Sequence, residues 1–242
     1  MTLPTSPAAT GPVSLSRQIH TRMRELIIRG TYPQGHKLVE LRIAEELGVS
    51  RVPLREAVPM LEMEGFVVTA ARRGAVVTTW TEQLVNDLFD LREVLEVGAA
   101  GLAARAVARG ASAAALEQAL QRAQAVVEGG DAYRIAEAST RFHETVVALT
   151  GNALMQASMR SVSGRVQWLF HLTSELDVHD AFHDHVELTA AITRGDVRMA
   201  EALAFAHIER DRGPSLAVLQ HQGHGAVPGE ADGNPLAESL GR

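Results

Sequence analysis

The chain has 242 residues, with 23 Lys and Arg against 29 Asp and Glu, 10 His and no Cys, for a formal net charge of −6. The length suits two domains, and the lack of cysteine excludes disulfides and thiolate metal sites. No charged-then-apolar leader pattern opens the sequence, and no apolar run approaches the roughly 20 residues that span a bilayer, so we expect a cytoplasmic protein outside the membrane.

Charge is divided unevenly along the chain. Residues 1–80 carry 10 basic and 7 acidic side chains, a net of +3, whereas the remainder carries 13 and 22, a net of −9. Such asymmetry is typical of a nucleic-acid-binding module joined to a domain with another task. Because the basic excess is small, we expect DNA specificity to come from individually placed arginines.

The chain is predicted to open with a disordered arm followed by a helix. Residues 1–14 are rich in Pro, Thr, Ser and Ala and have no apolar periodicity, which is typical of a disordered segment. Residues 15–29 place apolar side chains at helical spacing and end at Gly30. This helix begins a DNA-binding domain that we place at residues 15–80.

Residues 40–67 have the pattern of a helix-turn-helix. A short amphipathic helix ends at Gly48, since glycine enters the left-handed region at low cost. Ser50 is placed to cap the N-terminus of the second helix. Arg51 and Arg55, four residues apart, share a face at the N-terminal end of that helix, which meets base edges and phosphates in this motif.

A small hairpin is predicted directly after the second helix. Two β-prone runs, residues 66–70 and 75–79, flank a basic tip that ends at Gly74. Arg72 and Arg73 at this tip can reach the DNA backbone or the minor groove, as the wing of a winged helix does. The alternative for these arginines is ordinary surface charge.

From residue 81 onward the sequence predicts helices only. Low aromatic content and alanine-rich faces suit closely packed helices, and Gly213-Pro214 is a candidate break in the last one. The predicted helices are residues 82–109, 112–128, 131–150, 152–174, 178–194 and 196–219. The predicted fold class is therefore mostly α: an N-terminal winged helix-turn-helix, an all-α antiparallel helical bundle at 81–220, and a flexible tail at 221–242.

The order of these parts resembles the GntR transcriptional regulators. The string GVSRVPLREAV and a wing containing RRGAVV are similar to the DNA-binding domain of that family. The strings LFDLREVLE, RFHETVVALTGN and HVELTAAITRGDVRMAEALAFAHI resemble the FCD effector domain of the FadR-type branch, particularly its six-helix, VanR-like members. The resemblance implies a homodimer that binds a palindromic operator in double-stranded DNA and usually represses transcription. A small organic acid bound in the bundle would alter its DNA affinity.

The resemblance also assigns DNA contacts residue by residue. Arg51 and Arg55 match the arginines of the recognition helix beside Ser50, and Gly74 matches the wing glycine. Arg42 lies in the preceding helix, one place later than the DNA-contacting arginine common in the family. One recognition helix reads too few base pairs for useful specificity, so we expect a two-fold dimer on an inverted repeat.

Three histidines stand where an inward-facing site would need them. His143, His185 and His207 fall in three predicted helices, and the last two are 22 residues apart across a turn, which places them level on antiparallel helices. The resemblance implies that they form a metal site, whose fourth ligand is usually an aspartate one turn before the first histidine. That position is Ser139 here. Neutral imidazoles can hold Zn²⁺ or a similar divalent ion such as Ni²⁺; the alternative is a polar pocket without metal.

Arg92 is the remaining candidate for the pocket. It interrupts an apolar helix face, the family motif has arginine there, and its guanidinium suits a carboxylate, although an intrahelical pair with Glu96 is the alternative. We therefore expect the effector to contact Arg92, Ser139 and the three histidines. The rival function is a metal-dependent hydrolase or lyase. The sequence shows no HExxH-type pair or matching carboxylate beside the histidines to act as general base, so we expect a regulator and not an enzyme.

Overall fold

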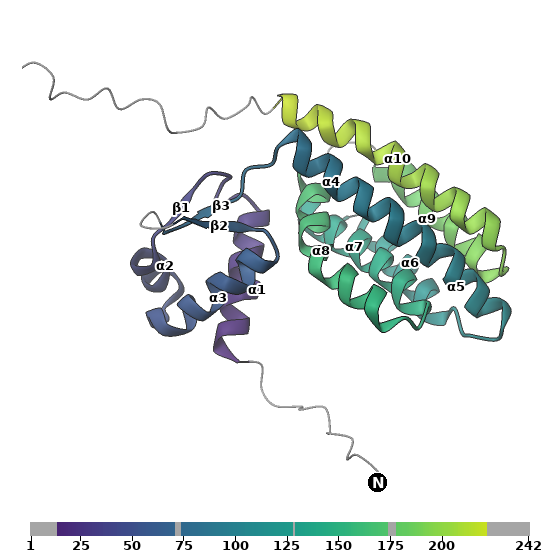
Figure 1. Cartoon of the computed structure of the whole chain (residues 1–242), viewed down its shortest axis with the longest axis horizontal. Coiled ribbons are helices and arrows are strands. Elements are labelled where there is room, and N and C mark those ends of the chain that lie inside the picture. The colour runs from purple at the N-terminus through teal and green to yellow at the C-terminus, as the bar shows by residue number, and fades with distance from the viewer. Residues whose placement is uncertain (1–13, 71–73, 128, 174–177, 222–242) are drawn as a thin grey trace, which may run out of the picture.

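A computed structural model of the chain describes residues 14–70, 74–127, 129–173 and 178–221, with a small N-terminal domain beside a larger helical one (Figure 1). The mostly α fold class is confirmed, with the winged helix-turn-helix first and the helical bundle after it. The predicted arm, apart from Ser14, and the predicted tail, apart from His221, lie outside the described residues.

The N-terminal domain has the predicted architecture and one additional strand. The sheet is antiparallel with strand order β1-β3-β2, so the hairpin of β2 and β3 forms the expected wing. Strand β1 is too short to carry a sequence signal, and it pairs with β3 through Lys37 and Leu38. The elements are α1 (Leu15–Ile28), β1 (Lys37–Leu38), α2 (Glu40–Leu47), α3 (Arg51–Met63), β2 (Val67–Ala70) and β3 (Gly74–Val77).

The turn between α2 and α3 is built as the sequence predicts, with one difference. Gly48 ends α2 at a φ of 64°, in the left-handed region. Ser50 occupies the N-cap position of α3, but its side chain makes no capping hydrogen bond. Helix α1 packs against α3, and the buried Met23, Leu54 and Leu61 belong to the core that holds α3 in place.

Every regular element among the described residues of the second domain is a helix. Most of the predicted helices are found within a few residues of their expected bounds, but the first is divided. The elements are α4 (Glu82–Arg92), η1 (Glu93–Val97), α5 (Gly98–Ala108), α6 (Ala114–Val127), α7 (Ala132–Leu149), α8 (Ala153–Leu172), α9 (Val178–Thr193) and α10 (Val197–His221).

The first predicted bundle helix contains a π-helical turn. The sequence predicts a uniform α-helix over residues 82–109, whereas residues 93–97 form η1 between α4 and α5. A π-turn fits an extra residue into one turn and is often found at functional sites. Here it carries Glu96, whose side chain is buried. A sequence pattern does not reveal such a turn, because the apolar spacing on either side stays helical.

The last helix is not interrupted at Gly213-Pro214, where the sequence offers a candidate break, since α10 continues to His221. Proline removes one backbone hydrogen bond from a helix. Beyond it, Ser215 is buried, and Leu216 and Leu219 pack against the hydrophobic core. This packing holds the last turns of the helix in place despite the proline.

Helix α8 of the bundle packs against the N-terminal domain. The Trp168 ring stacks on Phe66 of the N-terminal domain with centroids 5.3 Å apart, and Arg165 Nε donates to the Glu64 carbonyl oxygen at 2.8 Å. Gly164 lets the domains approach closely, because a Cβ there would lie 2.7 Å from Cε2 of Phe66. The contact fixes the N-terminal domain against the bundle through side chains that are largely buried.

Candidate functional site

The residues predicted to contact DNA are exposed where the structure describes them. Arg51 begins α3, Arg55 follows one turn later, and Arg42 lies on α2, all with exposed side chains. Gly74 begins β3 with a φ of 79°, a conformation that side-chain-bearing residues rarely adopt. Arg72 and Arg73 lie outside the described residues.

Arg55 has a partner that the sequence did not predict. Its Nε lies 2.7 Å from Oε2 of Glu40, at the N-terminus of α2. Both side chains are exposed, and an exposed ion pair of this kind contributes about 1 kcal/mol or less. The pair therefore orients Arg55 without holding it back from a phosphate or a base edge.

The three predicted histidines meet inside the bundle. His143 comes from α7, His185 from α9 and His207 from α10, and each is about 3% exposed. Their ring centroids are 4.9 to 5.2 Å apart, and one ring nitrogen from each lies within 4.8 Å of the other two. The turn at Gly195, with a φ of 71°, reverses the chain between α9 and α10 and so brings His185 level with His207.

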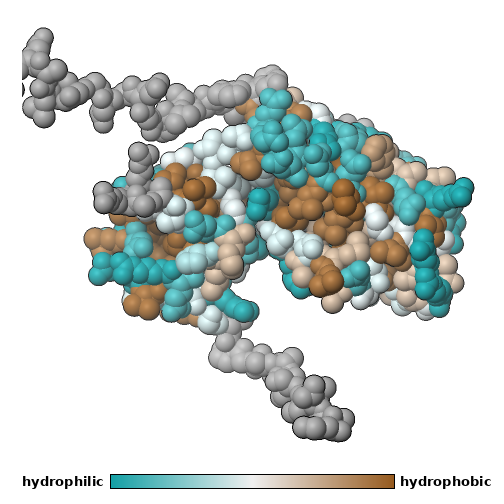
Figure 2. All heavy atoms as spheres, in the orientation of Figure 1, coloured by the Kyte–Doolittle hydropathy of each residue, from teal (hydrophilic) through white to brown (hydrophobic). Residues whose placement is uncertain are grey.

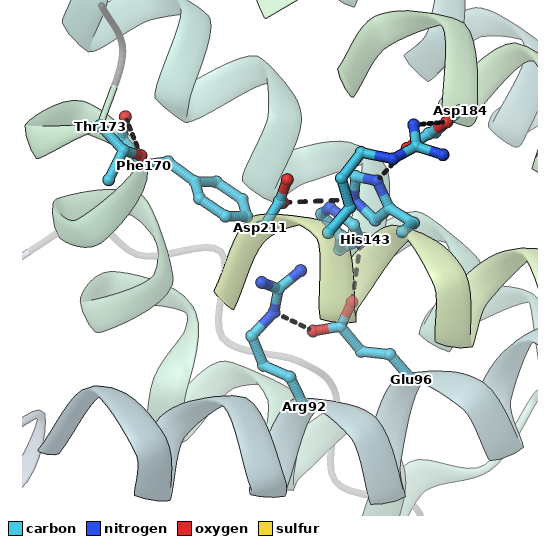
Figure 3. A network of polar contacts seen from close by, with 9 residues as sticks. Arg92, Glu96, His143, Phe170, Thr173, Asp184 and Asp211 are labelled. Atoms are coloured by element: carbon cyan, nitrogen blue, oxygen red, sulfur yellow. Dashed lines mark hydrogen bonds and ion pairs between the residues drawn. The ribbon is translucent and has the colours of Figure 1, made fainter. Parts of the chain in front are cut away.

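Two carboxylates hold the histidine rings from outside (Figure 3). Glu96 Oε2 lies 2.7 Å from Nδ1 of His143, and Asp184 Oδ2 lies 3.1 Å from Nδ1 of His207. The expectation that no carboxylate stands beside these histidines is therefore wrong. Both carboxylates contact the Nδ1 side, where they orient the rings. The sequence predicts Glu96 only as a partner of Arg92, and the one signal for Asp184 is its place directly before His185.

The Nε2 atoms of the three histidines are the nitrogens available to a ligand. Among the described residues, Nε2 of His143, His185 and His207 is buried in each case without a hydrogen-bond partner. Buried polar atoms are almost always satisfied, so three unpaired nitrogens in one cluster are suited to bind a common ligand. Asp211 adds a carboxylate on this side, with Oδ2 3.7 Å from Nε2 of His207. The donor set fits a divalent ion such as Zn²⁺ or Ni²⁺.

Burial keeps two of these imidazoles neutral. It lowers the pKa of His143, against the opposing effect of Glu96, and it lowers the pKa of His185 further, with the nearby His207 ring adding to the effect. Burial alone would raise the pKa of the Glu96 carboxyl, but Arg92 and His143 hold that pKa well below its usual value. The site therefore combines an ionised carboxylate with neutral rings whose lone pairs can bind a metal.

Arg92 forms the intrahelical pair with Glu96 and keeps two further donors unpaired among the described residues. Its side chain is 1% exposed, and Nε donates to Oε1 of Glu96 at 2.8 Å, so the intrahelical pair is present. Its two terminal nitrogens are buried and have no hydrogen-bond partner in the described part of the chain. The rings of Phe89 and Phe170 lie 5.2 and 4.9 Å from the guanidinium carbon. Two unpaired donors of a planar guanidinium match the two oxygens of a carboxylate.

Ser139 lies one turn before His143 on α7 and is half-buried. Its hydroxyl brings no negative charge to the position where the family pattern has aspartate. A cavity of about 10 Å³ adjoins His143 and His207 and is also lined by Glu96 and the apolar side chains Val146, Leu188, Ala204 and Ile208. A space of this size holds about one water or one ion.

Comparison with known protein families decides between a regulator and an enzyme. The FCD domain matches residues 87–210, and the bacterial regulatory proteins of the gntR family match residues 15–77. The chain belongs to the GntR family of regulators that carry an FCD domain. It is a DNA-binding transcriptional regulator, and the hydrolase or lyase alternative finds no support. None of the described helices is long and apolar enough to cross a membrane.

Similar GntR proteins match over most of their length. The "Probable D-xylose utilization operon transcriptional repressor" of Paenarthrobacter nicotinovorans is 28% identical over 78% of this chain and 85% of its own. The "Nta operon transcriptional regulator" of Aminobacter aminovorans is 26% identical over 77% and 87%. A crystal structure of a GntR regulator from Rhodococcus sp. RHA1 has a TM-score of 0.72 at 25% identity, covering 84% of this chain and 97% of that one.

Proposed function

We propose that this GntR regulator is a cytoplasmic homodimeric repressor whose affinity for a palindromic operator changes when a small organic acid binds the FCD domain. Exposed Arg51 and Arg55 would read bases from the N-terminal end of α3. Arg42, Ser50 and the wing would contact the backbone beside them. The name of the Paenarthrobacter relative supports repression.

We infer that His143, His185 and His207 hold a divalent ion, Zn²⁺ or Ni²⁺, through their Nε2 atoms. The support is that these three buried nitrogens have no hydrogen-bond partner among the described residues, while Nδ1 of His143 and of His207 faces a carboxylate. When bound, the ion would supply a Lewis-acidic centre for an oxygen of the effector. Because Ser139 adds no charge, Asp211 is the carboxylate that can reach this side of the site.

The observation that carries the effector proposal is the buried Arg92 guanidinium. Its two terminal nitrogens lack partners in the described structure, although Glu96 neutralises its charge through Nε. An effector carboxylate would accept hydrogen bonds from both nitrogens through its two oxygens, and other oxygen atoms of the effector would face the histidines. The adjoining cavity of about 10 Å³ is too small for an organic acid. We therefore propose that the helices around this cavity separate when the effector enters, and that this movement is the signal.

The test measures binding of the purified protein to a DNA fragment from its own promoter region. Fluorescence anisotropy would report operator affinity with and without a panel of organic acids, sugar acids and amino acids. We expect at least one acid to change the affinity, and we expect Arg92→Lys to bind the operator while losing this response, because an ammonium lacks the planar fork. Failure to bind promoter DNA, or an unchanged response in Arg92→Lys, would contradict the proposal.

A further inference from the structure

The outer side of the first bundle helix carries an apolar stripe that no described part of the chain covers. Leu91, Val94 and Leu102 are exposed along α4, η1 and α5, with Val94 at 80%. Figure 2 shows hydrophobic side chains gathered over the middle of the bundle, where α4 runs in Figure 1. The opposite side of this helix is also buried in the core through Phe89, Ala99 and others. A helix that is apolar on both sides generally packs against two neighbours.

A glycine in the same stripe indicates a close approach from outside. Gly98 begins α5, and a Cβ added there would meet no atom within 4 Å. Glycine is unfavourable inside a helix compared with alanine, and no described residue uses the space that it leaves. By contrast, Gly101 on the inner side is needed within the chain, because a Cβ there would lie 2.2 Å from Oε1 of Glu201. The open space at Gly98 is thus available to a partner.

The charges at the two ends of the stripe complement each other. Asp87 lies toward the N-terminal end of α4, where its described partner is Gln83, and Arg105 lies near the C-terminal end of α5 with no ion-pair partner among the described residues. Both side chains are exposed. An antiparallel copy of the same helix would place Val94 of one chain over Gly98 of the other. The same register sets Leu91 near Leu102 and Asp87 opposite Arg105, twice in the assembly. A two-fold interface requires this reciprocity, in which residue i contacts j and j contacts i.

We propose that two copies of this chain pair antiparallel through this outer helix face, defined by Asp87, Leu91, Val94, Gly98, Leu102 and Arg105. The inference rests on the proposed homodimer and names the surface that forms it. The occupant is a second copy and not another protein, because the apolar stripe, the space at Gly98 and the two charges match their own antiparallel image. The face continues the helix that carries Arg92 and Glu96, so each effector site would lie directly behind the interface.

The first test measures the oligomeric state by sedimentation velocity at micromolar concentration. Val94→Glu should raise the dimer dissociation constant at least about tenfold, because a charge would be buried at the centre of the interface. Leu154→Glu is the matched control, since Leu154 is also 80% exposed but lies on α8. Circular dichroism would verify that both variants are folded. A Val94→Glu protein that dimerises as tightly as the Leu154→Glu control would overturn the proposed surface.

The second test uses charge reversal. Asp87→Arg and Arg105→Asp should each weaken the dimer, because each creates two like-charge contacts across the axis, and the double variant should recover most of the loss. Because the chain has no cysteine, Val94→Cys should also cross-link between chains with a short bismaleimide, while Leu154→Cys should not. A protein that is monomeric in every form would overturn the homodimer itself. A dimer with no rescue and no selective cross-link would overturn only the surface.

Discussion

Replacing Glu96 with glutamine should destabilise the bundle more than any exposed charge change. The Glu96 carboxylate is buried and contacts two buried groups, Nε of Arg92 at 2.8 Å and Nδ1 of His143 at 2.7 Å. Glutamine keeps the shape but leaves the Arg92 guanidinium without a counter-charge. Breaking a buried ion pair in this way costs about 3–5 kcal/mol. At about 2–4 °C per kcal/mol for a chain of this size, the melting temperature should fall by roughly 6–20 °C.

The assay is calorimetric unfolding at a fixed protein concentration, with urea unfolding as a second measure. Glu144→Gln is the control, because its carboxylate pairs with Arg141 at a similar 2.9 Å but at the surface, and it should cost about 0.5 kcal/mol or less. Arg92→Met combined with Glu96→Gln should recover much of the stability, since no buried charge is then left unpaired. A loss below about 1 kcal/mol for Glu96→Gln alone would refute the reasoning.

Three further outcomes are expected. Arg51→Ala and Arg55→Ala should each cost about 1–3 kcal/mol of operator binding and much less for unrelated DNA, which titration against both sequences at one salt concentration would check. Ser139→Asp should slow metal loss during chelator dialysis while Asp211→Asn should hasten it, with Ser139→Asn as the neutral control and metal content as the readout. Gly164→Ala should lower the free energy of unfolding in urea by about 1–3 kcal/mol, because its methyl group would press against the Phe66 ring. A loss no larger than that of the exposed Ser161→Ala control would contradict this.

Local patterns predicted most of the architecture. The left-handed glycine at Gly48 and the apolar spacing on both sides of it determine the helix-turn-helix, and the wing strands follow from two short β-prone runs. Strand β1 and the π-turn η1 escaped prediction for opposite reasons. The strand has only two residues and no periodicity of its own. The π-turn changes the number of residues per turn without changing which residues are apolar.

Only part of the candidate site could be predicted from the sequence. Spacing across a single turn placed His185 and His207 at one level, and the resemblance to the GntR family added His143. Their carboxylate partners could not be predicted, because Glu96 and Asp184 reach histidines on other helices, His143 and His207. Such pairs depend on how helices are rotated about their axes, which sequence spacing does not define. The same holds for Arg55, whose pair with Glu40 spans two helices of the DNA-binding domain.

Helix α8 connects the candidate effector site to the DNA-binding domain. Phe170 places its ring over the guanidinium of Arg92, and Trp168, two residues earlier, stacks on Phe66 of the DNA-binding domain. A ligand that displaces Phe170 therefore acts on the same rigid helix that supports α3 and the wing. Thermodynamic linkage then works in both directions, since an acid that loosens the protein from its operator by some factor must itself bind the operator-bound protein more weakly by that factor. Promoter DNA would consequently set the metabolite concentration to which the regulator responds.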